Sequence, residues 1–169
     1  IYNYKELRKE LISEGFAFST NSDTEVLLNS YIAWGKHTLN KIQGMFAFAI
    51  WNRQTKKLFC ARDPLGQKPF YYTRVNNQFY FASELACFKW LSKHQLILDS
   101  NSIFSYLNEE AFYGESTIYK GIYKLVEGTY IEWDDKKFIK GRYFESYPSD
   151  NYKKTLNKEE LKEKLIEHT

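Results

Sequence analysis

The chain has 169 residues, with 24 lysines and arginines against 21 aspartates and glutamates, so its formal net charge is only +3. A chain of this length buries one substantial core and is too short for two ordinary domains. The basic residues form no separate block, and the charge therefore gives no indication of a nucleic-acid partner. The longest apolar run, Met45–Trp51, is far shorter than the ~20 residues that a membrane helix needs, so we expect no membrane partner.

The two cysteines, Cys60 and Cys87, are too few for a disulfide framework or a metal-ligand cluster. Each lies within an apolar stretch, and we expect both to be core residues of a protein in the reducing cytoplasm. The three histidines are scattered in polar surroundings, show no metal-ligand pattern, and are expected to be exposed: His37, His94 and His168. We therefore expect no metal site in this chain.

Two helices are predicted at the start of the chain. Asn3 and Glu6 have the spacing of a reciprocal helix cap, and Ser22 and Glu25 repeat it. The apolar residues that follow each cap are spaced for one helical face, namely Leu7, Leu11 and Ile12 in the first helix and Val26, Leu27, Tyr31 and Trp34 in the second. The spacing therefore gives each predicted helix one apolar stripe.

Glycines mark the ends of these helices, at Gly15 and Gly35. We expect a short strand over residues 16–18 and a third helical turn around Leu39 and Ile42. From Met45 the apolar period changes to two, which predicts a strand. Both faces of this strand are apolar, so we expect it to take a central position in its sheet.

A hairpin joins this first strand to a second over residues 57–61, and two more strands follow at 70–74 and 78–82, joined at Asn76 and Asn77. Four consecutive strands predict an antiparallel sheet. Ser83 and Glu84 begin a predicted helix, and residues 100–112 form another with Ile103, Phe104 and Leu107 turned inward. Strands at 129–133 and 138–143 form a further hairpin, which we expect to complete a second sheet. The pattern predicts an α+β fold.

Three groups of segments resemble the class II glutamine amidotransferase domain of glutamine-hydrolysing asparagine synthetases. In chain order they are Ile1–Asn3 and Asn21–Val26; Gln43–Trp51 and Ala61–Tyr72; Phe81–Glu84, Thr117–Ile122 and Leu125–Gly128. Their order and spacing match the family over about residues 1–145. The resemblance implies the N-terminal-nucleophile hydrolase fold, a four-layer αββα sandwich with largely antiparallel sheets. It also implies glutamine as a substrate.

In that family, the cysteine at the start of the mature protein attacks the glutamine side-chain amide, and its own α-amino group serves as the base. The released ammonia passes to a synthetase domain that activates aspartate with ATP and magnesium. The resemblance places the nucleophile and the oxyanion-hole residues upstream of Ile1. We therefore expect residues 1–148 to be the amidotransferase domain without its start and residues 149–169 to be a linker and the first helix of the synthetase domain. A homodimer is a candidate assembly.

The resemblance implies that Asp23 binds the α-amino group of glutamine, although an acid in the first turn of a helix also suits the helix dipole. Ser22 is expected to cap that helix and to support the ligand loop. Arg62 and Asp63 precede a turn-forming Pro-Leu-Gly sequence, and we expect them to support this loop through an ion pair. Glu84 is a candidate contact at a domain interface.

Two alternatives remain beside asparagine synthesis. The same domain is joined to other acceptor domains in sugar-modifying and β-lactam-forming relatives, and a domain that has lost its nucleophile could serve as a scaffold only. The paired aromatic residues of the predicted strands suggest base stacking, but without interleaved basic residues core packing is favoured.

Overall fold

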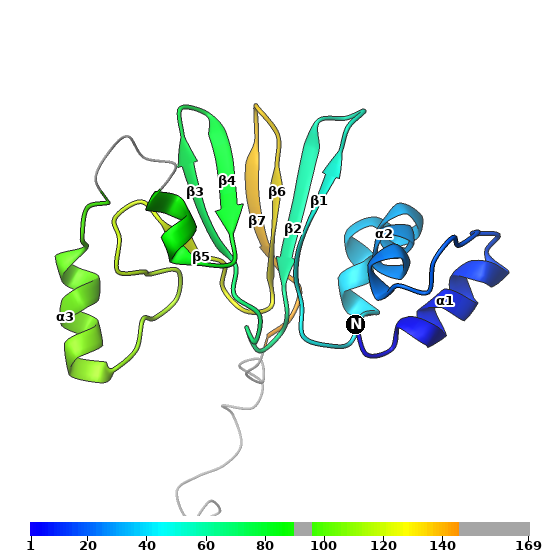
Figure 1. Ribbon diagram of the computed structural model, residues 1–169, viewed down its shortest axis with the longest axis horizontal. Helices are drawn as coiled ribbons and strands as arrows, with labels where there is room; N and C mark the ends of the chain where they lie inside the picture. Colours follow the sequence, from blue (N-terminus) through cyan, green and yellow to red (C-terminus); the bar gives the residue numbers. More distant parts are fainter. Residues whose placement is uncertain (90–95, 146–169) are drawn as a thin grey trace, which may run out of the picture.

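The computed structural model describes residues 1–89 and 96–145 of the chain. Two antiparallel sheets lie between two groups of helices, so that the layers follow in the order helix, sheet, sheet, helix (Figure 1). This arrangement confirms the predicted α+β fold. The predicted linker and helix over residues 149–169 lie outside the described residues, as do His94 and His168.

The first layer contains α1 (Tyr4–Ser13), α2 (Asp23–Trp34) and the 3-10 helix η1 (Gly35–Asn40). The first sheet has the strand order β1-β2-β6-β7, formed by β1 (Ala47–Asn52), β2 (Lys57–Arg62), β6 (Thr129–Trp133) and β7 (Phe138–Arg142). The second sheet has the order β4-β3-β5, formed by β4 (Gln78–Ala82), β3 (Tyr71–Val75) and β5 (Tyr123–Lys124). The last layer holds η2 (Leu85–Lys89) and α3 (Ser100–Glu109).

Strand β2 lies in the middle of the core because its two faces pack in different layers. Phe59 and Ala61 contact the helices of the first layer, whereas Leu58 and Cys60 contact the second sheet. Each of these four side chains is at most 6% exposed. The period of two in the sequence thus distributes neighbouring apolar residues between two cores.

Three predictions about the sheets need correction. Strand β1 is an edge strand among the described residues, because only β2 pairs with it. Its faces are both apolar since Phe48 packs against the helices and Ala47 against the second sheet, which covers the faces without adding a neighbouring strand. The 129–143 hairpin joins the first sheet beside β2, and it is β3–β4 that belongs to the second sheet. Residues 16–18 form no strand.

The helix starts were placed correctly, but some of the predicted contacts are wrong. Asn3 precedes α1 without capping it, and its side chain instead binds the main chain of Lys41 and Gln43. In α3, Phe104 and Leu107 are 68% and 74% exposed, so they do not face inward as predicted. Helix α3 also ends at Glu109, where the left-handed conformation of Glu110 stops it before Phe112.

Two neighbouring residues of α1 allow a direct test of the first core. Leu11 is fully buried, whereas Ile12, which the sequence placed on the same face, is 53% exposed. We expect Leu11→Ala to lower the free energy of unfolding by about 2–5 kcal/mol, because it removes buried methyl groups and leaves a cavity. The measurement is urea denaturation of the chain. Ile12→Ala is the matched control, and equal losses in both variants would contradict this packing.

Candidate functional site

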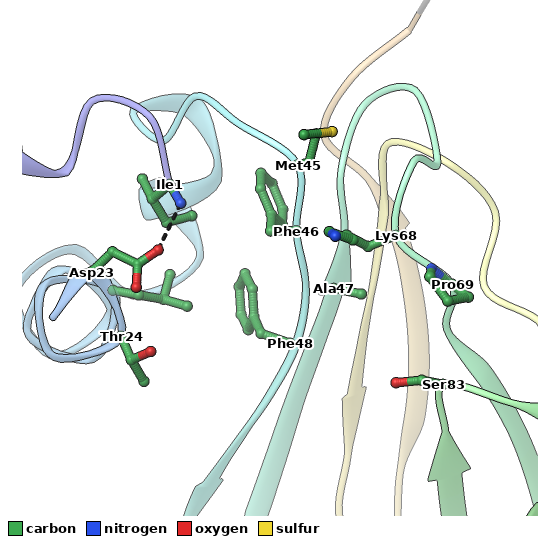
Figure 2. A pocket seen from close by; sticks show the side chains of 11 residues that line it. Ile1, Asp23, Thr24, Met45, Phe46, Ala47, Phe48, Lys68, Pro69 and Ser83 are labelled. Carbon is green, nitrogen blue, oxygen red and sulfur yellow. Dashed lines mark hydrogen bonds and ion pairs between the residues drawn. The ribbon is translucent and has the colours of Figure 1, made fainter.

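A pocket of about 470 Å³ opens between the start of α2, the segment leading into β1, and the loop before β3 (Figure 2). Its floor is apolar and includes Leu27, Phe46 and Phe48. Two charged side chains line it, Asp23 from the helix layer and Lys68 from the loop. An apolar cavity with a few convergent polar groups is the usual form of a small-molecule site.

The first turn of α2 places Asp23 at the pocket. The Ser22 hydroxyl accepts a hydrogen bond from the Thr24 amide at 3.1 Å, as the predicted cap requires. Glu25 does not complete a reciprocal cap with Ser22, which corrects the prediction. Its carboxylate instead accepts the amides of Ser19 and Thr20, each at 2.7 Å, and so holds the turn that leads into the helix.

Asp23 binds a primary ammonium group in this structure. The α-ammonium of Ile1 donates a hydrogen bond of 2.8 Å to Oδ2 of Asp23, and this contact is the dashed line in Figure 2. The hydrogen bond from this ammonium is the largest cause that lowers the pKa of Asp23, and the amides of the first turn lower it further. Asp23 also lines the pocket, so its carboxylate can be reached from the pocket side.

The loop between β2 and β3 is organised by Arg62 and Asp63. The described residues show no ion pair between them, so the predicted pairing is wrong; each instead binds main-chain groups. The buried Arg62 guanidinium donates to the carbonyls of Lys68, Leu125 and Gly66 at 2.7, 2.7 and 2.5 Å. Both charged groups are buried, and main-chain groups of the loop and of Leu125 satisfy their hydrogen bonds.

The Asp63 carboxylate accepts hydrogen bonds from main-chain amides of the same loop. Its two oxygens bind the amides of Leu65, Gln67 and Lys68 at 3.1, 2.9 and 2.9 Å, and the residue is 1% exposed. Gly66 completes the turn with a φ of +64°, and a side chain there would meet the Arg62 guanidinium at 3.1 Å. A glycine is therefore required at this position.

Residues of the same loop form hydrogen bonds with three other segments. The Asp63 amide donates to the carbonyl of Phe46, and the Asp63 carbonyl accepts the amide of Gly128. The hydroxyl of Tyr143 donates to the Arg62 carbonyl at 2.6 Å. Burial raises the pKa of this phenol, so it remains a hydrogen-bond donor at neutral pH. These contacts connect the pocket wall to β1 and to both ends of the β6–β7 hairpin.

Neither cysteine lies in the pocket. Cys60 is fully buried between the sheets, and desolvation raises the pKa of its thiol, so it is a core residue as predicted. Cys87 is exposed on η2, which corrects the expectation of a core role. His37 is exposed as predicted. Within residues 1–89 and 96–145, no group of three metal-binding side chains occurs and no helix is long and apolar enough to cross a membrane.

Several pocket residues were not singled out from the sequence as site residues. Lys68 and Ser83 come from the loop before β3 and the end of β4, far from Asp23 in the chain. Phe48 was interpreted as a core residue, and it both packs against the first core and lines the pocket. A lysine beside a proline carries no local signal of a site, and only the meeting of the two layers brings it opposite Asp23.

Comparison with known proteins agrees with the fold. A glutamine amidotransferase domain family matches residues 1–144. The chain belongs to this family, as the resemblance predicted.

The particular relatives are asparagine synthetases. Asparagine synthetase [glutamine-hydrolyzing] 1 of Bacillus subtilis is 41% identical over 129 residues, which are 76% of this chain and 20% of that protein. A putative asparagine synthetase of Mycobacterium bovis is 36% identical, over 85% of this chain and 23% of its own length. A putative asparagine synthetase of Methanocaldococcus jannaschii is 34% identical, over 95% of this chain and 31% of its own length. The chain thus spans less than a third of each of these three relatives.

Solved structures show the same fold. Glutamine phosphoribosylpyrophosphate amidotransferase from B. subtilis, complexed with ADP and GMP, superimposes with a TM-score of 0.58 at 20% identity, over 84% of this chain and 27% of that one. A structure of the allosteric regulatory enzyme of purine biosynthesis superimposes with a TM-score of 0.59 at 21% identity, over 84% of this chain and 26% of that one. These likenesses confirm the predicted fold of the amidotransferase class.

The loop contacts predict a large effect of removing the Asp63 carboxylate. We expect Asp63→Ala to destabilise the chain by about 1–3 kcal/mol, because three loop amides lose their buried acceptor. Amide hydrogen exchange at Leu65, Gln67 and Lys68 should accelerate in this variant. Asp134→Ala is the control, since Asp134 also accepts two backbone amides but in an exposed turn where water can replace it. Equal destabilisation by the two changes would refute the role given to Asp63.

The ammonium contact predicts how Asp23 titrates. In the chain that starts at Ile1, the carboxyl of Asp23 should titrate below its ordinary value, and acetylation of the Ile1 nitrogen should raise the midpoint because the cation is lost. A lowered folded-state pKa gives stability that is present above the unfolded-state pKa and is lost as the pH falls through the folded-state pKa. The acetylated chain should therefore lose less stability on acidification. NMR of the carboxyl carbons measures this, and Glu25, whose pKa is lowered mainly by Ser19 and Thr20, should not respond.

Proposed function

We propose that this chain is the glutamine-binding part of an asparagine synthetase that hydrolyses glutamine to glutamate and ammonia and uses the ammonia to amidate aspartate. Membership of the amidotransferase family supports glutamine as the substrate. The identity of 34–41% to three asparagine synthetases supports aspartate as the acceptor. ATP and magnesium would act in a synthetase domain, and the described residues contribute no metal cluster to it.

The observation that carries the proposal is the carboxylate of Asp23, which the first turn of α2 places in the lining of an apolar pocket. In a protein that continues upstream of Ile1, the Ile1 nitrogen is a peptide nitrogen without charge. The Asp23 carboxylate is then available to a ligand ammonium, and we assign it the α-ammonium of glutamine. A charge-assisted hydrogen bond of this kind both anchors and orients the substrate.

The nucleophile is assigned to residues upstream of Ile1. Cys60 is buried away from the pocket and Cys87 is not among its lining residues. The hydroxyls that do line the pocket, on Thr24 and Ser83, have no histidine among the lining residues to act as a base. The described residues therefore supply binding and scaffold, with Ser22, Arg62 and Asp63 as supporting residues.

The test uses the full-length gene product with aspartate, magnesium-ATP and amide-labelled glutamine, followed by mass spectrometry. Label in asparagine is the expected result. Glutamate without labelled asparagine would indicate another acceptor, and neither product would favour a scaffold role. In an active protein, Asp23→Asn should raise KM for glutamine by about tenfold or more, since a charged hydrogen bond is lost. The exposed Asp135→Asn is the matched control and should leave KM unchanged.

A further inference from the structure

A second pocket, of about 260 Å³, lies at the end of the two sheets opposite to the Asp23 pocket, where the β3–β4 and β6–β7 turns are found (Figure 1). The two turns are joined there, because the side-chain amide of Asn77 donates to the carbonyl of Asp135 at 3.0 Å. Both sheets and the segment before β5 contribute to the lining, which consists of Arg74, Asn77, Gly121, Tyr123 and Trp133. The two pockets share no lining residue.

Arg74 supplies a positive charge to this pocket. Its guanidinium carbon lies 4.1 Å from the centre of the Phe138 ring, a cation–π contact that reaches from β3 in the second sheet to β7 in the first. No carboxylate lines the pocket, and none lies within ion-pair distance of Arg74 in residues 1–89 and 96–145. The aromatic ring holds the guanidinium without neutralising it, so the charge is available to an anion.

Two aromatic side chains of the lining are held in place by rings of the core. The Tyr123 ring lies 5.6 Å from the ring of Tyr72, and Trp133 stacks on Phe79 with 5.8 Å between the ring centres. Tyr123 is nevertheless 44% exposed, so its ring can be reached from solvent. Aromatic faces of this kind can pack against a planar ligand, and the phenol and the indole each add a hydrogen-bond donor.

The backbone of Gly121 leaves the space beside these rings open. A side chain there would meet no atom within 4 Å, and the Gly121 carbonyl already accepts the Thr73 hydroxyl at 2.7 Å. A second cation, Lys140, lies 5.8 Å from the centre of the Tyr123 ring, but its ammonium group is paired with Glu115 at 2.6 Å. Arg74 is therefore the group to which an anion would bind.

We propose that this second pocket binds a small aromatic carboxylate, with the carboxylate on Arg74 and the ring against Tyr123 and Trp133. The planar fork of a guanidinium matches a carboxylate in two hydrogen bonds. The ligand is small because the pocket is below the ~300–1,000 Å³ of sites for drug-sized molecules. This binding site is additional to the proposed glutaminase function and does not depend on it.

The test measures binding of three probes to the full-length gene product by saturation-transfer difference NMR. Benzoate has both the ring and the charge, benzamide is its neutral counterpart, and acetate has the charge without the ring. Arg74→Met removes the charge and Arg74→Lys keeps it without the fork. The matched control is Arg53→Met, because Arg53 is exposed in the β1–β2 turn and lines neither pocket. Circular dichroism and thermal unfolding verify that each variant is folded.

We expect benzoate to bind the wild-type protein with a Kd on the order of 1 mM, as suits a ligand of so few atoms. Arg74→Met should weaken benzoate about tenfold, as for the loss of a charged hydrogen bond, and Arg74→Lys should recover part of the affinity. In the wild type, benzamide and acetate should each bind about tenfold more weakly than benzoate, since each lacks one of the two contacts. Arg53→Met and Asp23→Asn should bind benzoate as the wild type does.

Three results would overturn the proposal. Equal affinities for benzoate and benzamide would mean that no charge is recognised. Benzoate binding that survives in Arg74→Met, or that is lost in Asp23→Asn, would place the ligand elsewhere in the protein. No saturable binding of benzoate would leave Arg74 as a solvated partner of Phe138 only. None of these results bears on glutamine hydrolysis, which the labelled-glutamine experiment tests separately.

Discussion

The buried charges of Arg62 and Asp63 are the constraint on which the pocket depends. Arg62 is the last residue of β2 and Asp63 follows it. Backbone groups of the next loop bind both side chains, and the Leu125 carbonyl also accepts from Arg62. Removing a charge from water is costly unless every polar contact is replaced. If the loop changed its conformation, these buried charges would lose their hydrogen-bond partners. These hydrogen bonds therefore hold the loop that forms one wall of the pocket.

The opposite wall of the pocket, at the start of α2, is held by a different set of contacts. Glu25 and Ser22 bind the turn and the first amides of α2, and these contacts set where the helix begins and where Asp23 points. Leu7, Leu11 and Val26 hold α1 and α2 against the sheet from behind. The pocket is thus the gap between two rigid units that belong to different layers. Its volume and the placing of its two charges follow from how those layers pack on β1 and β2.

Local patterns in the sequence predicted most helices and strands, because each element has a characteristic spacing of apolar residues and characteristic residues at its ends. The helix starts at Asn3 and Ser22 and the hairpin turn at Asn76 and Asn77 are such signals, and both asparagines have the positive φ that this turn requires. The partners of the strands could not be obtained in this way. Alternating apolar residues show that a face is covered, but a helix, a sheet or a hairpin can cover it. The predictions of a central position for β1 and of a second sheet for the last hairpin were therefore wrong.

The site shows the same limit. The resemblance drew attention to Asp23 and to the Arg62–Asp63 pair, yet adjacent opposite charges in a sequence suggested an ion pair that the fold does not form. Arg62 donates to main-chain carbonyls and Asp63 accepts from main-chain amides, so each charge is satisfied by the backbone instead of by the other. Lys68 gave no local signal, because only the fold brings it into the same pocket as Asp23, 45 positions away in the chain.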